Sequence, residues 1–551
     1  MRAQMMDFPL TVTSIMRHAR KVHGRATVAS VTLDSARVES PAQEYTWGDA
    51  FRRVDQLGNA LQRLGVELGE RIATLAWNDH RHVELYFGIA CLGAVCHTIN
   101  PRLFPEQVAY IINHAEDQWL FVDPLIVPLV EKLQPTLPSV KGYVLLCDRA
   151  NMPETGLPNA LCYEELLAPE PEAFDWPELD ENSAAGLCYT SGTTGDPKGV
   201  LYSHRSTVLH TMMIALPDVM GVSSRSVLMP LVPMFHVNAW GAVHVAAMTG
   251  ANLVLPGPKM LDGEVISALI NRYQVDYSLG VPTIWLALVE YLQSSGETVP
   301  SLQQVVVGGA ACPESLKQAL EGYGVSVHPG WGMTETSPLG AYYVPPVGLA
   351  EMSAEQQAQY RTKAGRAVFG VEMKIEDPQG NELPWDGDSA GELKVRGPWV
   401  AGDYYKLHGT DDHFDNGWFA TGDVATIDSD GYMAITDRVK DVIKSGGEWI
   451  SSIDVENAAM GHPAVAEAAV IGIPDPKWTE RPLLVVVLRP DAEAGAGSSA
   501  ESILESLQGK IADWWVPEHC VFVDQLPHTA TGKVSKKTLR EQMSGYALEK
   551  Q

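Results

Sequence analysis

The chain is poor in positive charge, because its 551 residues include 40 lysines and arginines against 68 aspartates and glutamates, a formal net charge of −28. Binding to nucleic acid or to an anionic membrane needs clustered positive charge, so we exclude both as general functions. The chain also lacks any apolar run of about 18 residues and an apolar leader after Met1, which excludes an integral membrane segment and indicates a cytoplasmic location. A polyanionic ligand must therefore meet local cations.

Cysteine is scarce and carries no pattern, with seven residues, an odd number, and no CxxC pair. We therefore exclude a disulfide framework. Cys91 and Cys96 flank an apolar stretch, and we interpret both as buried thiols in preference to metal ligands. Hydrophobic residues at 45% and charged residues at 20% are typical of a globular chain, and 551 residues are too many for one core. Two or more domains are expected.

The stretch from Tyr189 to Val200 concentrates glycines and hydroxyl side chains around one lysine. Glycine lets backbone N–H groups approach an anion, hydroxyls add donors, and Lys198 adds a positive charge, so the stretch predicts a phosphate-binding loop. The residues expected at the phosphates are Thr190, Ser191, Gly192, Thr193, Thr194, Gly195 and Lys198.

This loop lies between two predicted strands. The apolar run 184–189 indicates a buried strand, and residues 199–202 indicate another. A Walker P-loop would need a helix that opens at Lys198, but Pro197 disfavours helical geometry at Asp196. We therefore predict strand, loop, strand, with the loop at the carboxyl end of a sheet.

The first 180 residues alternate helical and strand patterns, which is typical of an α/β unit with a mostly parallel sheet. The predicted elements are a helix over 51–64 capped by Thr46, a strand over 71–77, a helix over 82–92 that ends at Gly93, and a strand over 94–99. Prolines between 153 and 177 indicate a connector.

Further elements follow the phosphate-binding loop. We predict a buried helix through Trp240, His244 and Met248, a strand over 302–307, and over 325–336 another strand that runs into a glycine-bearing turn. From Val371 onward, short strands separated by turns indicate a small barrel or meander. The last unit is expected to contain strands over 464–473 and 483–488, a Gly/Ser-rich turn over 495–499 and a helix over 503–514.

The change of pattern near Asp437 to Lys440 predicts a domain boundary. We expect an α/β fold with a large N-terminal domain, residues 1–436, that combines mixed α/β sheets with a small β-barrel-like subdomain. Residues 437–440 are the expected hinge, and residues 441–551 the expected small α+β C-terminal domain.

Separated motifs together resemble the adenylate-forming superfamily of acyl-CoA synthetases, luciferases and peptide-synthetase adenylation domains. They are the phosphate-binding loop, Gly330 to Thr336, Thr421 to Asp423, Asp437 to Glu448 and Thr531 to Lys533, in the same order along nearly the whole chain. Residues 235–238 and 446–451 are similar to the fatty acyl-CoA synthetase branch, including medium-chain and methylthiopropionate-CoA ligases.

The resemblance implies that the enzyme makes an acyl-adenylate from a carboxylic acid and Mg·ATP, releases pyrophosphate, and transfers the acyl group to the thiol of coenzyme A. Charge that develops on the α-phosphate must be stabilised by cations and N–H donors. By resemblance, Lys533 bridges the carboxylate and the α-phosphate, Thr334 contacts the α-phosphate, and Glu335 with Thr190 positions Mg²⁺.

For the nucleoside, the resemblance implies that Asp423 accepts both ribose hydroxyls, as one carboxylate can, with Arg438 beside them. A turn residue is the alternative for Asp423. The remaining residues expected to line this part are Gly309, Ala310, Trp331, Gly332 and Met333.

The same resemblance implies a hinge at Lys440 that rotates the small mobile C-terminal domain between adenylation and thioester formation. Rotation would remove Lys533 and bring other residues to the pantetheine tunnel. These residues are Ser445, Gly446, Gly447, Glu448 and Trp449. One departure is Thr479, at a position that relatives usually fill with glycine.

The acyl pocket is predicted in part. Relatives specific for acetate have a tryptophan at the position of Gly332, so glycine implies room beyond acetate. The walls implied by resemblance are His236, Val237, Trp240, Gly241, Gly309, Ala310 and Met333. His236 is either a gate or a core histidine. Since Trp240 would shorten the cavity, we favour short- to medium-chain acids, including methylthiopropionate, over long-chain fatty acids.

Rival functions are an ATP-dependent phosphotransferase with a P-loop, a luciferase-like adenylating oxygenase, a peptide-synthetase module and a non-catalytic nucleotide-binding regulator. Pro197 argues against the phosphotransferase, and the end of the chain at Gln551 without a carrier domain argues against the peptide-synthetase module. The presence of Lys533 and Glu335 argues against the non-catalytic regulator. The expected partners are therefore a small carboxylic acid, ATP and coenzyme A, with a homodimer as a hypothesis.

Overall fold

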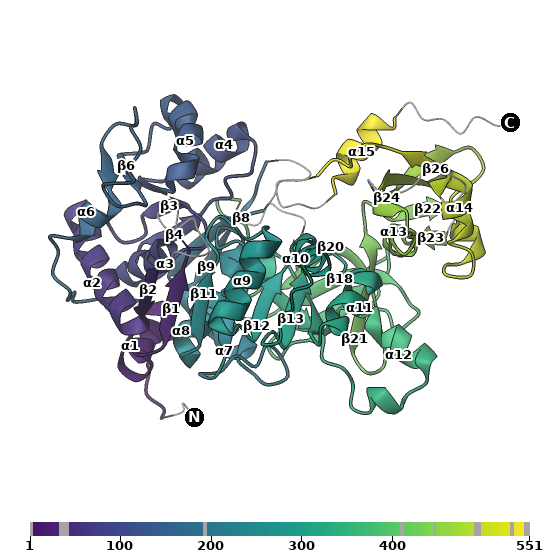
Figure 1. Ribbon diagram of the computed structural model, residues 1–551, viewed down its shortest axis with the longest axis horizontal. Helices are drawn as coiled ribbons and strands as arrows, with labels where there is room; N and C mark the ends of the chain where they lie inside the picture. The colour runs from purple at the N-terminus through teal and green to yellow at the C-terminus, as the bar shows by residue number, and fades with distance from the viewer. Residues whose placement is uncertain are drawn as a thin grey trace.

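The structure, a computed structural model, describes residues 4–31, 43–190, 196–407, 413–445, 448–489, 498–528 and 534–544. A large domain contains two extended sheets, and a smaller C-terminal domain contains a third. Figure 1 shows the small domain at the upper right, beside the end of the large domain that carries β18, β20 and β21.

The N-terminal sheet confirms the predicted α/β unit. Its seven described strands run in the order β7-β6-β5-β3-β4-β8-β9, and all neighbours are parallel except β8 and β9. The strands are β3 (Arg71–Leu75), β4 (Val95–Thr98), β5 (Trp119–Val122), β6 (Gly142–Leu145), β7 (Ala160–Cys162), β8 (Ala184–Tyr189) and β9 (Gly199–Ser203). Most of their residues are buried, as expected for parallel strands covered on both faces.

The second sheet is longer and changes character along its length. From β11 to β14 neighbouring strands are parallel, and from β14 to β17 they are antiparallel. Its strands are β1 (Thr27–Ser30), β2 (Gln43–Thr46), β10 (Val227–Pro230), β11 (Asn252–Leu255), β12 (Tyr277–Gly280), β13 (Gln304–Gly308), β14 (Ser326–Gly332), β15 (Leu339–Tyr342), β16 (Gly365–Ala367), β17 (Glu372–Glu376), β18 (Gly391–Arg396), β19 (Phe414–Asp415), β20 (Trp418–Ile427) and β21 (Tyr432–Arg438).

The short strands after Val371 form a meander on this sheet. Among the described residues, β17 and β2 are the two ends of the strand order, so the sheet does not close. The β-barrel-like alternative is therefore not formed, because β16 joins the meander to the parallel strands as one open sheet.

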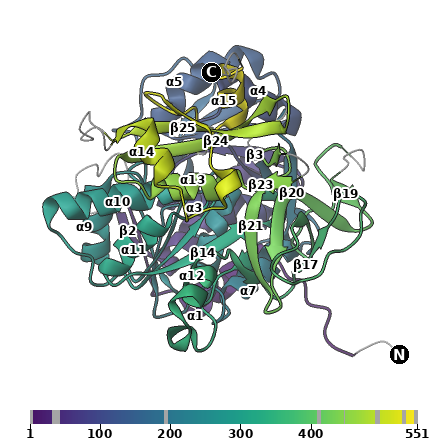
Figure 2. The ribbon, with the colours of Figure 1, turned by 90° about the vertical axis from the view of Figure 1, so that its right-hand side faces the viewer.

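Helices pack in three layers around the two sheets (Figures 1 and 2). Residues of α1, α2, α3, α7 and α8 share one core with both sheets, whereas α4 and α5 cover the outer side of the N-terminal sheet and α9 to α11 that of the long sheet. The helices are α1 (Val12–Val22), α2 (Trp47–Arg63), α3 (His80–Leu92), α4 (Pro105–Ala115), α5 (Val127–Leu133), α6 (Tyr163–Leu167), α7 (His204–Ile214), α8 (Ala242–Thr249), α9 (Gly263–Tyr273), α10 (Pro282–Ser295), α11 (Glu314–Gly322) and α12 (Ala354–Arg361).

Local helix signals behave as predicted in the first half. The side chain of Thr46 accepts from the backbone N–H of Asp49 and completes a capping box at the start of α2. Helix α3 ends at Gly93, whose φ of 86° lies in the left-handed region. The segment 153–177, predicted as a connector, instead contains β7 and α6, so prolines there separate short elements.

The small domain has a five-stranded sheet within its described residues, flanked by α13 (Ser452–Met460), α14 (Ala500–Glu505) and α15 (Lys536–Gln542). Its strands are β22 (Ile443–Ser445), β23 (Glu448–Ile450), β24 (Val465–Asp475), β25 (Thr479–Leu488) and β26 (His519–Phe522). The helix predicted over 503–514 is wrong beyond Glu505, because an isolated bridge between Gln508 and Ile511 interrupts it. The predicted turn over 495–499 lies mostly outside the described residues.

The second correction concerns the helix predicted through Trp240. Helix α8 begins only at Ala242, after a turn from Val237 to Gly241 whose backbone is left-handed. The prediction placed Trp240 within a buried helix, whereas the structure places it in the preceding turn, with its ring against Gly308 of β13. Across the described part of the chain, each helix is too short or too polar to span a membrane.

Candidate active site

A cavity of about 850 Å³ opens where the carboxyl ends of the parallel strands of both large sheets meet. Thr190 follows β8 and Asn100 follows β4, whereas Gly309 follows β13. Ligands of open α/β sheets bind at this edge, so the position agrees with the prediction for the phosphate-binding loop.

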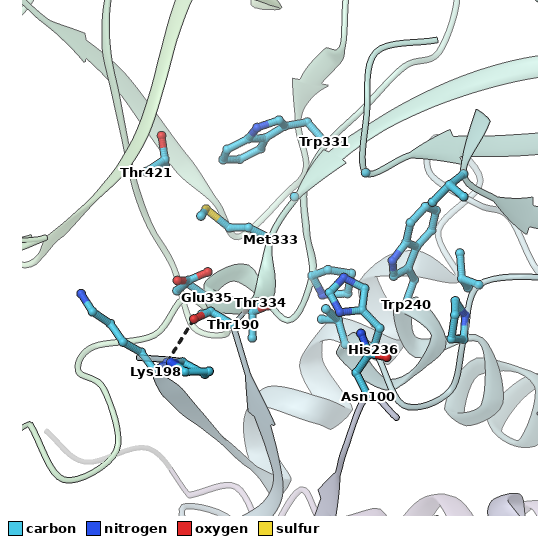
Figure 3. A pocket seen from close by; sticks show the side chains of 18 of the residues that line it. Asn100, Thr190, Lys198, His236, Trp240, Trp331, Met333, Thr334, Glu335 and Thr421 are labelled. Carbon is cyan, nitrogen blue, oxygen red and sulfur yellow. Dashed lines mark hydrogen bonds between the residues drawn. The ribbon is translucent and has the colours of Figure 1, made fainter. Parts of the chain in front are cut away.

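The cavity has two ends of different character. Figure 3 shows Lys198, Thr190, Thr334 and Glu335 together at one end and His236, Trp240 and Asn100 at the other, with Trp331 and Met333 between them. The first end is polar and charged. The cavity also has many apolar lining residues, among them Met220, Val232, Phe235, Val237, Val306 and Leu339.

The predicted strand, loop, strand arrangement is confirmed. Strands β8 and β9 are antiparallel, with Tyr189 opposite Gly199, and helix α7 begins only at His204. The Thr190 N–H donates to the Lys198 carbonyl at 2.9 Å, and the Lys198 N–H donates to the Thr190 hydroxyl oxygen at 3.1 Å. These bonds close the base of the loop. The predicted residues Ser191, Gly192, Thr193, Thr194 and Gly195 lie outside the described residues.

A short 3₁₀ turn, Thr334–Thr336, places Glu335 at the polar end. The Tyr202 hydroxyl donates to the Thr334 carbonyl at 2.7 Å, and the Tyr404 hydroxyl donates to Glu335 Oε1 at 2.6 Å. Only 5% of Glu335 is exposed, and this burial raises the pKa of its carboxyl despite the Tyr404 bond. The site thus holds a carboxylate whose charge is only partly compensated.

The donor set at this end fits a nucleotide-bound Mg²⁺ better than a cation held by protein alone. Within the described ranges no cluster of three or more His, Cys, Asp or Glu side chains could hold a metal. Mg²⁺ is commonly held by one or two carboxylates together with water and substrate phosphates. Glu335 with the Thr190 hydroxyl offers such a partial set at the mouth of the predicted phosphate-binding loop.

Trp331, Asp423 and Arg438 form one connected group, of which Trp331 and Arg438 line the cavity whereas Asp423 is not among its lining residues. The Trp331 Nε1–H donates to Asp423 Oδ2 at 2.9 Å, and Arg438 Nε lies 2.8 Å from Asp423 Oδ1. Asp423 and Arg438 are directly opposite each other on β20 and β21. Asp423 is buried, which argues against the alternative of an exposed turn residue.

The predicted hinge lies at the rim of the cavity. Arg438, the last residue of β21, lines it together with Val439 and Lys440, which follow the strand. Arg540 of α15 donates to the Lys440 carbonyl at 3.2 Å and forms an ion pair of 2.5 Å with Asp441. The C-terminal domain thus contacts the backbone of the predicted hinge directly.

The residues predicted for the pantetheine tunnel are described only in part. Ser445 is buried in the small domain, away from the cavity lining, and is in register with Thr479 across β22 and β25. Thr479 has a φ of 73°, a backbone conformation that favours glycine. Threonine therefore replaces the usual glycine at a position where the backbone geometry itself favours glycine. Gly446, Gly447, Lys533 and the side chains of Glu448 and Trp449 lie outside the described residues.

The end of the cavity that carries His236 and Trp240 is built on an unusual backbone. Val237, Asn238, Ala239 and Trp240 have successive φ angles of 45°, 50°, 48° and 55°, followed by Gly241 at 79°. For L-residues this left-handed geometry costs about 1–2 kcal/mol each, and such strain concentrates at functional sites. The turn presents His236, Val237 and Trp240 to the cavity, whereas Gly241 is not among its lining residues.

Trp240 is seated on the backbone of the long sheet. A Cβ added to Gly308 would lie 2.9 Å from the Trp240 ring, so the glycine allows the indole to approach β13 closely. Gly309 lines the cavity next to it, whereas the predicted wall residue Ala310 is exposed and does not. His236 is half-buried and lines the cavity, which argues against a core histidine.

The reason given for Gly332 needs correction. A Cβ at this position would lie 1.8 Å from the Pro338 carbonyl oxygen, so the side chain would point into the backbone before β15 and not into the cavity. Gly332 is therefore required by a close backbone approach. It lines the cavity through its backbone only, and room beyond acetate depends on Trp240 and the apolar lining.

Several site residues were missed by sequence reasoning. The buried amide of Asn78 donates to the Pro230 and Val232 carbonyls at 2.9 and 2.8 Å and accepts from the Met234 N–H at 2.7 Å, which fixes the segment before His236. Its position at the carboxyl end of β3 was an available signal. Tyr404 had no local signal, because its role depends on Glu335, which lies 69 positions away in the sequence.

The cavity combines a buried carboxylate and a lysine with an apolar lining, at the carboxyl ends of parallel strands. The family of AMP-binding enzymes matches residues 18–405, and the C-terminal domain of the AMP-binding enzymes matches residues 454–533. This chain belongs to the AMP-binding enzyme family.

Its relatives are CoA ligases. The chain is 50% identical to a 3-methylmercaptopropionyl-CoA ligase of Ruegeria lacuscaerulensis, over 98% of this chain and 99% of the relative. It is 45% identical to a medium-chain-fatty-acid–CoA ligase of Ectopseudomonas oleovorans, over 100% of this chain and 98% of the relative. The solved anthranilate CoA ligase AuaEII in complex with anthranoyl-AMP matches with a TM-score of 0.86 at 28% identity, over 98% of both chains.

Proposed function

We propose that this protein is an ATP-dependent acyl-CoA synthetase for short- to medium-chain carboxylic acids, including thioether acids such as 3-methylmercaptopropionate. The observation that carries the proposal is that one cavity holds the Glu335 carboxylate and Lys198 at one end and His236 and Trp240 at the other, with many apolar residues in its lining. The names of the similar ligases support this acid class.

In the proposed first step, a carboxylate oxygen of the acid attacks the α-phosphorus of ATP, the bond to the β-phosphate breaks, and pyrophosphate leaves. Lys198 and the N–H groups of its loop would hold the β- and γ-phosphates, and Thr334 would donate to the α-phosphate. Lys533 would bridge the two reacting groups. Mg²⁺, held by Glu335, Thr190 and phosphate oxygens, would neutralise charge on the phosphates.

At the nucleoside, the Asp423 carboxylate would accept the ribose hydroxyls while Trp331 fixes its orientation through the 2.9 Å bond. Trp331, Gly309, Gly332 and Met333 would enclose the adenine and the start of the acyl pocket. In the second step, the sulfur of coenzyme A attacks the acyl carbon, the thiol proton leaves to solvent, and AMP departs.

We also propose the division of labour between domains. Residues 1–436 would bind ATP and the acid, and residues 437–440 would act as the hinge of a mobile C-terminal domain, residues 441–551. Support comes from the position of Lys440 at the cavity rim and from the contacts of Arg540 with this segment. Rotation would exchange Lys533 for the segment Ser445 to Trp449. The homodimer stays a hypothesis that light scattering of the purified chain would test.

The proposal is tested with a panel of acids, from acetate through 3-methylmercaptopropionate, hexanoate and octanoate to palmitate, assayed with ATP and coenzyme A by AMP release and thioester formation. Activity should peak between 3-methylmercaptopropionate and octanoate. A peak at acetate would contradict the open pocket, and a peak at palmitate would favour a long-chain ligase.

A second experiment separates the half-reactions. Lys533→Ala is expected to abolish pyrophosphate release but to leave the conversion of supplied acyl-AMP and coenzyme A to thioester largely intact. Lys537→Ala, on α15, is the matched control and should retain both half-reactions. Equal loss of both half-reactions in the Lys533 variant would contradict the role proposed for this lysine.

A further inference from the structure

A segment far from the recognised motifs crosses the polar end of the cavity. Residues 399–405, between β18 and β19, are called the strap here. The Trp399 carbonyl accepts from the Ser337 hydroxyl at 2.7 Å, and the Ala401 N–H donates to the Glu335 carbonyl at 2.7 Å. At its other end the Tyr405 N–H donates to the Gly199 carbonyl at 2.8 Å. The strap therefore bonds both to the Glu335 turn and to the strand that follows Lys198.

Tyr404 makes the same connection through its side chain. Its hydroxyl donates to Glu335 Oε1 at 2.6 Å, and the Lys198 ammonium lies 4.8 Å from the centre of its ring. Only 4% of Tyr404 is exposed, and its ring also packs edge-on against Phe414 at 5.2 Å between centroids. One buried side chain thus touches both the carboxylate and the cation of the phosphate end.

These two contacts use different parts of the tyrosine. The hydroxyl has one proton, and its donation to Oε1 leaves Oε2 and the remaining lone pairs of Glu335 for other ligands. The ring face attracts the ammonium through its quadrupole and does not neutralise its charge. Packing against Phe414 would be satisfied by phenylalanine, so the hydroxyl is not explained by the core.

We propose that Tyr404 is a positioning residue that holds the Glu335 carboxylate and the Lys198 ammonium at a fixed separation, so that a metal-bound triphosphate meets both at once. This inference rests on the proposed function for the identity of the ligand. Tyr404 itself contacts neither reacting atom. It acts through Glu335 on the metal and through Lys198 on the phosphates.

Two variants separate the contacts. Tyr404→Phe keeps the ring beneath Lys198 and removes the bond to Glu335, whereas Tyr404→Leu removes both. Tyr360→Phe is the matched control, because the Tyr360 hydroxyl also donates to a carboxylate, that of Asp430, at 2.9 Å on an exposed surface. Binding of ATP to the full chain is measured by calorimetry with and without Mg²⁺, and folding is checked by thermal unfolding.

Tyr404→Phe is expected to weaken ATP binding in the presence of Mg²⁺ about tenfold, with metal-free binding unchanged within about twofold. Tyr404→Leu should weaken metal-free binding as well, about threefold or more. In a Glu335→Gln background, Tyr404→Phe should have no further effect on the Mg²⁺ dependence. Tyr360→Phe should match the wild type throughout.

Binding that is unchanged in Tyr404→Phe, or weakened equally with and without Mg²⁺, would overturn the proposal, because the residue would then have a general structural role. This test measures the binding of ATP with and without Mg²⁺, whereas the proposed function is tested by the formation of acyl-AMP and thioester. A wild type that binds Mg·ATP but forms no acyl-AMP with any acid contradicts the synthetase activity, whereas a Mg²⁺-specific loss in Tyr404→Phe still supports the positioning role.

Discussion

Trp331 donates its indole N–H to Asp423 at 2.9 Å, which joins an aromatic wall of the cavity to the carboxylate proposed to bind the ribose. The two residues lie 92 positions apart, on β14 and β20. The carboxylate is further held by Arg438 at 2.8 Å from its other oxygen. Its orientation is therefore set before a nucleotide binds.

This geometry predicts discrimination by the ribose hydroxyls. Asp423→Asn should reduce the preference of the enzyme for ATP over 3′-deoxy-ATP about tenfold, because a hydrogen bond to a charged acceptor contributes about 1.5–3 kcal/mol. The ratio of kcat/KM values for the two nucleotides is the measurement. Asp415→Asn, on β19, should leave the ratio unchanged. An unchanged ratio in Asp423→Asn would assign the ribose to another residue.

Trp240 predicts where the acyl chain stops. Trp240→Ala should shift the preferred acid toward longer chains, because the indole lies across the apolar end of the cavity and each buried methylene contributes about 0.8 kcal/mol. For acids longer by two methylenes, kcat/KM relative to the wild-type optimum should rise about tenfold. The exposed Trp385→Ala serves as the control. If the length profile stays the same, another part of the lining limits the pocket.

The hinge prediction concerns backbone freedom at Lys440. Lys440→Pro should leave acyl-AMP formation largely intact and block thioester formation, because proline fixes φ where the domain is proposed to rotate. Isotope exchange between ATP and pyrophosphate reports the first step, and release of acyl-CoA reports the second. Lys440→Ala removes the charge without stiffening the chain and should retain thioester formation. Normal turnover of coenzyme A in the proline variant would exclude this hinge.

Thr479 predicts a gain in stability. At a φ of 73° a β-branched residue is strained, and Thr479→Gly relieves that strain. Glycine also gives the unfolded chain more conformational freedom, which offsets part of the gain. The free energy of unfolding of the small domain should therefore rise by up to about 1 kcal/mol. Urea unfolding monitored by tryptophan fluorescence measures it. Thr298→Gly, in an exposed loop outside the left-handed region, should destabilise slightly. A loss of stability in Thr479→Gly would show that the threonine is compensated by contacts.

Asp79 predicts a pH dependence of folding. This buried residue caps α3, and burial raises the pKa of its carboxyl from 3.8 to about 6. A raised pKa in the folded state means that stability falls as pH rises from about 4 to 6, because the folded protein must then hold an unfavourable charge. Asp79→Asn also caps a helix, so it should stabilise the protein by about 1–3 kcal/mol at pH 8 and little at pH 4.

Thermal unfolding of both proteins across this pH range is the measurement. Asp262→Asn provides the comparison, because Asp262 caps α9 with a side chain that is 38% exposed. Its effect on stability should change little with pH. A constant difference between wild type and Asp79→Asn from pH 4 to pH 8 would contradict the raised pKa.

The parts of the fold that were predicted correctly depend on local chemistry. Pro197 next to Lys198 was sufficient to exclude a helix there, and the capping residue Thr46 and the terminal Gly93 marked helix ends that the structure confirms. These signals act within a few residues. They do not depend on what the segment packs against.

The parts that failed depend on distant packing. In the left-handed turn after His236, Asn238 and Gly241 tolerate positive φ, but valine, alanine and tryptophan do not favour it, so packing against neighbouring residues must stabilise the turn. The strands after Val371 were predicted as a small β-barrel-like subdomain but belong to an open sheet, because strand patterns do not say that β16 pairs with β15 and β21. The contact of Tyr404 with Glu335 spans 69 positions and leaves no trace in either local sequence.

The left-handed turn from Val237 to Trp240 also has an evolutionary consequence. Because the backbone conformation of the turn sets the position of the Trp240 ring, the acid preference of this enzyme can change without any replacement of a residue that touches the acid. A substitution that changed the turn to right-handed geometry would move Trp240 from its place against Gly308 and so change the shape of the cavity beside it. Selectivity in this branch can thus diverge through conformation as readily as through side-chain size.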